Sequence, residues 1–308
     1  MMTKVFIDGK AGTTGLRIYE RLEKRDDLEI VSLSESLRKS TAARKDALNS
    51  VDVAILCLPD DAAREAVSLV ENPHTVIIDA STAHRTQEGW AYGFPELSKE
   101  HRAAIQKSKR IANPGCYASG FISLVYPLIK SGILPVDTQL TCHAVSGYSG
   151  AGKKGIESYE AEERDSSLDT PRLYALGLSH KHLPEMKLQS GLKNAPIFTP
   201  YVCDYYAGMT VNVPLSVSAF QHKITVEELK DLYRDHYAGC KFVELKEEAS
   251  GYIAANTLNG TNRLEILVNG NEEQLLLTAR LDNLGKGASG AAIQNMNIAL
   301  GLDEDVSL

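Results

Sequence analysis

The stretch Lys4–Gly15, KVFIDGKAGTTG, decides the fold of the first part of the chain. It opens with a short β-type run, passes through glycines at positions 9, 12 and 15, and leads into a helical pattern in which Leu16, Ile18 and Leu22 are apolar among charged residues. Glycines between a strand and a helix bring the backbone close to a pyrophosphate, which rests on the helix N-terminus. The stretch therefore predicts a dinucleotide-binding turn. Its glycine spacing differs by one residue from GxGxxG, and a plain turn is the alternative.

Strands and helices alternate beyond this turn. We expect strands at Leu28–Leu33, Val51–Leu58 and Thr75–Asp79, with a helix at Ala62–Val70. The run Val51–Leu58 is almost wholly apolar, as is typical of a strand covered by helices on both faces. This alternation predicts an α/β fold of the Rossmann type, with a doubly wound parallel sheet.

After about Cys116 the pattern changes to that of an α+β domain with a mixed or antiparallel sheet and helices on one side. Proline cannot donate a ladder hydrogen bond, so Pro214 is expected at the edge or the end of a strand. Thr225 and Glu228 form a capping box that begins a helix. The expected strands, without regular helices between them, are Leu140–Val145, Ala207–Val213, Leu264–Val268 and Gln274–Leu281.

The last expected helix, Ala288–Leu300, is apolar around much of its circumference, interrupted by Gln294, Asn295 and Asn297. A helix of this kind packs into the body of a protein. We therefore divide the chain into a dinucleotide-binding domain (1–115), a catalytic domain (116–282) and a C-terminal helix (283–308) that returns to the first domain.

Composition excludes several function classes. Acidic residues exceed basic ones by 40 to 33, which argues against a protein whose main role is to grip nucleic acid. The longest apolar runs, such as Phe121–Ile129, are too short to span a bilayer, and the first residues show no secretory pattern, so we expect a cytoplasmic protein. Five cysteines without CxxC spacing indicate neither a disulfide framework nor a zinc site.

Cys116 is the candidate nucleophile. In the stretch Asn113–Ser119, NPGCYAS, a Pro-Gly turn precedes the apolar run Phe121–Ile129, so the thiol is expected at a helix N-terminus. The free N–H groups and the helix dipole there favour the thiolate, which attacks activated carbonyl carbon. The alternative is a buried cysteine that acts as a small hydrophobe.

A histidine pair, His180 and His182, is the candidate acid/base. Both residues lie in the loop-like segment Ser179–Glu185, SHKHLPE, where the carboxylate of Glu185 is available to orient a ring. A metal site is the rival interpretation, and it is disfavoured because no third ligand follows at a recognisable spacing.

A second glycine-rich loop, Ser146–Lys154 (SGYSGAGKK), exposes backbone N–H groups, hydroxyls and two lysines. These groups suit a phosphate, although the loop lacks the spacing of a nucleotide P-loop. A flexible surface loop is the alternative.

The end of the second strand bears on the choice between NAD and NADP. Ser34 or Ser36, with Arg38 and Lys39, would hold a 2′-phosphate, whereas Glu35 would bind a ribose 2′-hydroxyl. NADP is favoured because the groups suited to phosphate are more numerous. The alternative is a solvated charge pair.

Taken together, these motifs resemble the N-acetyl-γ-glutamyl-phosphate reductase family of arginine biosynthesis, which is related to aspartate-semialdehyde dehydrogenase. The length resembles the shorter of the family's two forms, and Thr13 departs from the tyrosine usual there. The matching stretches follow the family's order: GKAGTTG (9–15), LPDDA (58–62), DASTAHR (79–85), NPGCY (113–117), AVSGYSG (144–150), HKHLPE (180–185) and DNLGKGASG (282–290).

The resemblance implies NADPH-dependent reduction of N-acetyl-L-glutamyl 5-phosphate to the 5-semialdehyde with release of phosphate, through a thioester on Cys116. It implies His180 as the acid/base, with His182 as the competing choice, and Glu185 as a residue that orients the histidine or binds substrate. It also implies a homo-oligomer, dimer or tetramer, and no metal.

The resemblance further implies that NADP is bound by Gly12, Thr13, Thr14 and Gly15, with contacts from Pro59, Ser81, Asn283, Lys286 and Gly287. Gly9, Ser34 and Arg38 complete the expected cofactor site. The expected substrate site comprises Arg85, Asn113, Ser146, Gly147, Ser149, Lys153 and His182.

Two kinds of alternative stay open. Aspartate-semialdehyde dehydrogenase, or another N-acyl-amino-acid semialdehyde dehydrogenase, would use the same fold and mechanism. A non-catalytic NADP sensor that keeps the fold is disfavoured because Cys116, His180 and Lys286 are all present.

Overall fold

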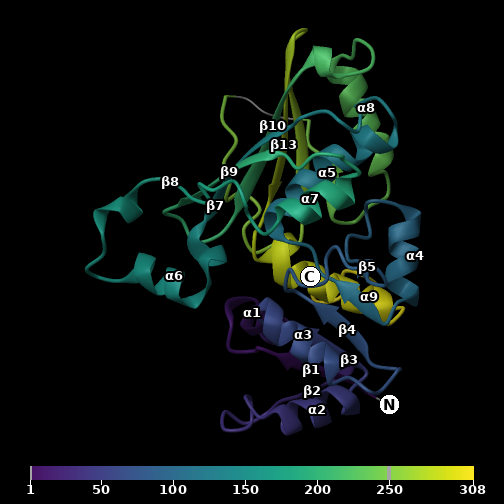
Figure 1. The fold of residues 1–308 in the computed structure, drawn as a ribbon, viewed down its shortest axis with the longest axis vertical. Helices are drawn as coiled ribbons and strands as arrows, with labels where there is room; N and C mark the ends of the chain where they lie inside the picture. Colours follow the sequence, from purple (N-terminus) through teal and green to yellow (C-terminus); the bar gives the residue numbers. More distant parts are fainter. Residues whose placement is uncertain (1, 248–250) are drawn as a thin grey trace. The chain divides into compact units, whose positions relative to one another are not determined.

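The computed structural model describes residues 2–247 and 251–308, which form two compact units. Unit 1 is Met1–Pro114 with Ala288–Leu308, and unit 2 is Gly115–Gly287. Each unit is built around one sheet (Figure 1). Within the described ranges, no helix is both long and apolar enough to cross a membrane.

Unit 1 contains a six-stranded sheet in the order β2-β1-β3-β4-β6-β5, in which every pairing is parallel. Since β1 lies between β2 and β3, the carboxyl end of β1 is a point where the strand order reverses, and ligands bind at such points. The strands are β1 (Thr3–Asp8), β2 (Leu28–Val31), β3 (Val53–Leu56), β4 (Val76–Asp79), β5 (Ala91–Tyr92) and β6 (Arg110–Ala112). The helices are α1 (Thr13–Leu22), α2 (Thr41–Ser50), α3 (Asp60–Ser68), α4 (Lys99–Lys107) and α9 (Gly290–Ala299).

Alternate residues of β1 face opposite sides of this sheet. Val5 and Ile7 belong to an apolar cluster that includes residues of α1, α4 and α9, whereas Phe6 belongs to a second cluster that includes residues of α2 and α3. Helices therefore cover both faces, and the doubly wound fold predicted from the sequence is confirmed.

The C-terminal helix α9 belongs to the core of unit 1 and lies beside α4, although the two are far apart in sequence (Figure 1). Its polar interruptions are buried and hydrogen-bonded: Gln294 donates to Glu96, Asn295 donates to the carbonyl of Gly93, and Asn297 accepts from Arg25. Buried polar groups are tolerated when they are paired in this way.

Unit 2 contains a seven-stranded mixed sheet in the order β11-β12-β13-β10-β7-β9-β8. The pairs β11–β12 and β7–β9 are parallel, and the other pairs are antiparallel. The strands are β7 (Thr141–Gly147), β8 (Arg172–Leu173), β9 (Ile197–Cys203), β10 (Met209–Ser216), β11 (Val243–Leu245), β12 (Leu264–Gly270) and β13 (Gln274–Leu281). The helices are α5 (Cys116–Lys130), α6 (Gly152–Glu160), α7 (Leu183–Ser190) and α8 (Val226–His236).

Helix α5 is the centre of unit 2. It packs against β10, β12 and β13 of the sheet and against α7 and α8. Gly120 allows the close approach, because a Cβ there would lie 2.6 Å from a methyl carbon of Val211. Tyr233 of α8 and Tyr237, the C-cap residue of that helix, donate hydrogen bonds to carbonyl groups of α5. This packing fixes the direction of α5 and therefore the position of its first residue, Cys116.

Two expectations for this half need correction. Regular helices do lie between the strands: α6 and α7 separate β7 from β10. The sequence shows no clear helical pattern for α6 and α7. Helix α6 buries only Tyr159, and α7 has Pro184 in its first turn. Pro214 lies inside a central strand, but β7 pairs with β10 only through Asn212, so Pro214 lies at a local edge. The capping box at Thr225 is confirmed.

Candidate active site

The glycine turn of unit 1 links β1 to α1. Gly12 is the N-cap of α1, and its N–H donates to the carbonyl of Gly9 at 3.0 Å. Gly9 has φ +89°, and a Cβ there would lie 2.2 Å from the carbonyl oxygen of Cys57. A Cβ on Gly15 would lie 2.5 Å from the carbonyl oxygen of Gly9. Positions 9 and 15 therefore admit only glycine.

A pocket of about 520 Å³ opens at this turn, and among its lining residues are Gly9, Gly12, Arg38 and Pro59. Thr13, Thr14 and Gly15 form the first turn of α1, where backbone N–H groups lack intrahelical partners and attract anions. The pocket and the helix terminus together fit a dinucleotide. Among the expected cofactor residues, Gly9, Gly12, Arg38 and Pro59 line this pocket. The others do not: Thr13, Thr14, Gly15, Ser34, Ser81, Asn283, Lys286 and Gly287.

Arg38 and Glu35, which argue for different coenzymes in the sequence, lie together in the structure. Glu35 Oε1 is 3.3 Å from Arg38 Nη2, both side chains are exposed, and both residues line the pocket. The Ser34 hydroxyl lies 3.0 Å from that of Ser36. An exposed ion pair of this kind contributes little, so a coenzyme 2′-phosphate can displace Glu35 from Arg38.

Replacing Arg38 with glutamine is expected to raise the KM for NADP about 10-fold and to leave the KM for NAD within about 2-fold, because the predicted contact of Arg38 is with the 2′-phosphate, which only NADP carries. Steady-state kinetics with both coenzymes measures the change. An equal rise in both values would contradict a 2′-phosphate contact.

A buried ion pair lies beneath the turn. Asp8 ends β1, and its Oδ2 lies 2.9 Å from Arg44 Nη2 of α2, while Arg44 Nη1 reaches Glu65 at 3.2 Å. Burial raises the pKa of Asp8, although Arg44 opposes the rise. The positive charge of Arg44 offsets the negative charge of the Asp8 carboxylate, which would otherwise repel a bound pyrophosphate. The sequence analysis missed this pair because α2 gave no clear pattern.

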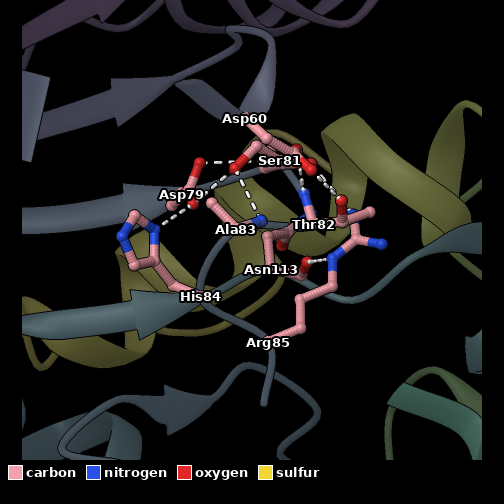
Figure 2. Close-up of polar contacts among 9 residues, drawn as sticks. Asp60, Asp79, Ser81, Thr82, Ala83, His84, Arg85 and Asn113 are labelled. Carbon is pink, nitrogen blue, oxygen red and sulfur yellow. Dashed lines mark hydrogen bonds and ion pairs between the residues drawn. The ribbon is translucent and has the colours of Figure 1, made fainter. Parts of the chain in front are cut away.

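The segment after β4 is held by two carboxylates (Figure 2). Asp79 Oδ2 accepts a hydrogen bond from Ser81 Oγ at 2.7 Å and lies 2.6 Å from His84 Nδ1. The His84 ring stacks on Trp90 at 4.0 Å. Asp60 accepts from the backbone N–H of Thr82 at 2.9 Å. The Ser81 hydroxyl therefore donates within unit 1, and its contact with NADP stays a prediction.

Arg85 and Asn113 are buried and joined to each other. Arg85 Nε donates to the carbonyl of Asn113 at 2.8 Å, and Arg85 Nη2 donates to the carbonyl of Ala80 at 2.9 Å (Figure 2). The Asn113 amide donates to the carbonyl of Ala288 and accepts from Asn295. Both ends of this amide are thus engaged within unit 1, which favours a positioning role. Substrate contacts of Arg85 and Asn113 stay predictions.

In unit 2, helix α5 begins at Cys116, as the sequence predicts, with Gly115 as its N-cap. Glu185 of α7 is buried and accepts a hydrogen bond from the backbone N–H of Gly115 at 2.8 Å. Glu185 therefore fixes the residue directly before Cys116. The expectation that it orients a histidine or binds substrate stays a prediction.

A pocket of about 450 Å³ in unit 2 brings together several predicted residues. Its lining includes Cys116, Ser146, Gly147, His180 and His182. Gly147 is required there, because a Cβ would lie 2.6 Å from the carbonyl oxygens of Tyr205 and Tyr206.

Two other predicted substrate residues lie outside this lining. Ser149 is buried and accepts from the Asn283 amide at 2.9 Å. Lys153 is exposed, with its Nζ 3.9 Å from Glu157. Among the described residues, no group of three or more His, Cys, Asp or Glu side chains could hold a metal ion.

The two histidines contact each other edge to face, with ring centroids 4.8 Å apart. Nδ1 of His180 accepts from the backbone N–H of His182 at 3.1 Å, so a neutral His180 carries its proton on Nε2. Burial, aided by Lys181, lowers the pKa of His180 to about 4. His180 is therefore neutral at pH 7 and is able to accept a proton.

This low value predicts the pH dependence of aldehyde oxidation. If His180 is the base, kcat/KM falls as the pH drops through about 4, because the protonated ring cannot accept a proton. Lys181→Gln removes a cation that lowers the pKa, so the acid limb moves to higher pH. A pH profile whose acid limb is the same in both proteins would assign the base elsewhere.

The residues that follow β13 reach Cys116. A Cβ on Gly287 would lie 2.7 Å from the Cβ of Cys116. Asn283 is buried, and its amide oxygen accepts from the N–H of Gly208 at 2.8 Å. Lys286 is also buried, with its Nζ 5.8 Å from the ring centroid of Phe242. Cofactor contacts of these three residues stay predictions.

The sequence analysis missed three side chains that line the unit 2 pocket: Tyr117, Arg172 and Tyr174. Tyr117 follows the nucleophile directly and was visible in NPGCYAS as a polar group beside the thiol. Arg172 begins β8, a two-residue edge strand, and Tyr174 directly follows it; the pairing of β8 with β9 leaves no local signal in the sequence.

Comparison with known proteins identifies the family. Residues 4–105 match the family model for the semialdehyde dehydrogenase NAD binding domain, and residues 116–283 match that for the semialdehyde dehydrogenase dimerisation domain. The N-acetyl-gamma-glutamyl-phosphate reductase of Trichormus variabilis is 49% identical, over 99% of each chain. The chain belongs to the N-acetyl-gamma-glutamyl-phosphate reductase family.

Other members of this family are similarly close. The reductase of Mesorhizobium japonicum is 49% identical, over 98% of this chain and 100% of the relative. Reductase 2 of Pseudomonas putida is 46% identical over 96% of each chain. The resemblance stated from the sequence motifs is confirmed.

Solved structures show the same fold at lower identity. Aspartate semialdehyde dehydrogenase II from Vibrio cholerae superposes with a TM-score of 0.72 at 16% identity, over 98% of this chain and 99% of that one. The enzyme from Francisella tularensis gives a TM-score of 0.71 at 16% identity, over 96% and 99%. At this identity the likeness concerns the fold alone.

Proposed function

We propose that this protein reduces N-acetyl-L-glutamyl 5-phosphate to N-acetyl-L-glutamate 5-semialdehyde with NADPH and releases phosphate. The observation that carries the proposal is the unit 2 pocket, which places Cys116 at a helix N-terminus beside two histidines. Curated relatives at 49% identity bear the name of this activity. Aspartate-semialdehyde dehydrogenase is not favoured, because the likeness to those structures is 16–17% identity.

In this proposal Cys116 Sγ attacks the acyl carbon, the bond from that carbon to the phosphate oxygen breaks, and a thioester forms. The first N–H groups of α5 stabilise the negative oxygen. When bound, NADPH supplies the hydride that reduces the thioester. His180 or His182 holds the proton that the adduct oxygen gains and gives up as it collapses to aldehyde and thiolate. Glu185 keeps Gly115, and with it the helix terminus, in place.

The charge of the pocket suits this substrate, which carries a phosphoryl group and an α-carboxylate. Arg172 lines the pocket, its Nη2 donates to Tyr159 at 3.1 Å, and its Nε is buried without an acceptor among the described residues. A carboxylate supplies such an acceptor, so Arg172 is our candidate for the α-carboxylate. Arg85 stays a predicted substrate contact.

The reverse reaction tests the proposal. Purified protein with NADP, phosphate and N-acetyl-glutamate semialdehyde is expected to form NADPH only when phosphate is present, and aspartate semialdehyde is expected to give little or none. Turnover of aspartate semialdehyde alone would move the protein to the sister activity, and turnover of neither would favour the sensor interpretation.

We also propose that the protein acts as a homo-oligomer in the cytoplasm. The family model that covers residues 116–283 is described as a dimerisation domain, which supports the oligomer. Sedimentation velocity distinguishes a dimer from a tetramer.

A further inference from the structure

Two tyrosine hydroxyl groups are joined along the unit 2 pocket. The Tyr174 hydroxyl donates to the Tyr117 oxygen at 3.0 Å, and the nearby Ser146 Oγ donates to the carbonyl of Gly147 at 3.0 Å. Each hydroxyl has one proton to donate, and a carbonyl only accepts. The Tyr174 proton is therefore engaged in the bond to Tyr117.

The oxygen of Tyr174, whose proton is donated to Tyr117, is left as an acceptor. It lines the same pocket as Cys116 and His180. Burial raises the pKa of Tyr174, so the hydroxyl remains protonated at neutral pH. A substrate group beside Tyr174 must consequently donate a hydrogen bond.

The charge of the pocket narrows the choice of donor. The cations among its lining residues are Arg172 and Lys181, and no described lining residue is a carboxylate. Asp165 is near enough for Arg172 to help lower its pKa, after hydrogen bonds from Ser167, but it does not line the pocket. An α-ammonium group buried here would lack a counter-charge, which is costly. An acylated α-nitrogen is neutral and still donates one hydrogen bond.

Strand β8 and the residue that follows it place Arg172 and Tyr174 on one face. Arg172 pairs with Val202, and the N–H of Tyr174 donates to the carbonyl of Pro200 at 3.2 Å, while Leu173 between them is 41% exposed. Residues two apart on an extended strand lie about 7 Å from each other on the same side. The α-carboxylate and the α-nitrogen share one carbon, so a carboxylate at Arg172 brings the nitrogen toward Tyr174.

We propose that Tyr174 selects substrates with an acylated α-nitrogen, by accepting a hydrogen bond from the amide N–H while the acid-free pocket disfavours a free ammonium group. This inference rests on the proposed function, and it specifies which group of the substrate the unit 2 pocket recognises. Tyr174 is thereby a specificity-determining residue, separate from the groups that carry out the chemistry.

The test compares N-acetyl-glutamate semialdehyde with its ester analogue, in which oxygen replaces the amide N–H. The native protein is expected to favour the amide in kcat/KM by about 10- to 100-fold, because the ester leaves the Tyr174 oxygen without a donor. In Tyr174→Phe this preference is expected to fall to about 3-fold or less, mainly because kcat/KM for the amide substrate decreases. Tyr148→Phe is the matched control, since that hydroxyl reaches Glu160 and Tyr148 does not line the pocket.

A second variant tests the direction of the protons. Tyr117→Phe removes the acceptor of the Tyr174 proton. The Tyr174 hydroxyl then becomes able to donate to the ester oxygen. The kcat/KM preference for the amide over the ester is therefore expected to fall in this variant as well. An equal loss with amide and ester in Tyr174→Phe, or an unchanged preference in both variants, would overturn the inference. Failure of the native protein to oxidise the acetylated aldehyde would instead overturn the proposed function.

Discussion

Replacing Cys116 with serine is expected to lower kcat by about 1,000-fold or more and to leave NADP binding unchanged. A serine hydroxyl does not ionise near neutral pH, so the helix terminus has no anion to stabilise, and the bound acyl group meets a poor nucleophile. Cys116 belongs to unit 2 and is not among the residues that line the unit 1 pocket, so coenzyme affinity is expected to persist. Steady-state rates and titration with NADP measure the two effects.

Cys203→Ser is the matched control, because this half-buried thiol lies in β9 and does not line the unit 2 pocket. Its kcat is expected to stay close to that of the native protein. Near-native turnover in Cys116→Ser, or an equal loss in both variants, would contradict a role for Cys116 as the nucleophile.

Gly287→Ala is the second change with a large expected effect. The new methyl group would lie 2.7 Å from the Cβ of Cys116, so the nucleophile must move. A displacement of this order lowers kcat about 100-fold, because the attack depends on alignment with the acyl carbon. We expect the rate of Cys116 alkylation to fall as well, while the KM for NADP changes little.

Gly177→Ala serves as its control, since a Cβ there would meet its nearest neighbour, Ser179 Oγ, at an ordinary 3.5 Å. A rise in the KM for NADP with kcat preserved would instead assign Gly287 to the coenzyme, as the family resemblance implies. The two roles are thus separated by which kinetic constant changes.

The parts of the fold that the sequence predicted correctly have local causes. The glycine turn, the apolar strand β3 and the capping box at Thr225 each depend on neighbouring residues, and all three are present. The position of Cys116 at a helix N-terminus is also local, because the Pro-Gly turn before it starts the helix.

The features that sequence reasoning missed depend on long-range packing. Glu185 meets Gly115 only because α7 packs against α5. Arg172 and Tyr174 enter the pocket only because β8 pairs with β9. The ends of the Asn283 amide reach Gly208 and Ser149, which are distant in sequence. No spacing of residues along the sequence predicts any of these partners. A sequence motif therefore indicated that a residue belongs to the site without indicating which residues it contacts.

The central claim, a thioester on Cys116, is tested most directly by a single turnover without phosphate. Protein mixed with NADP and N-acetyl-glutamate semialdehyde is expected to form one NADPH per active site and then stop, since no phosphate is present to release the acyl group. Mass spectrometry of the digested protein is expected to find an N-acetylglutamyl group on the peptide that contains Cys116. Continued NADPH formation without any adduct, or an adduct on another residue, would contradict the account.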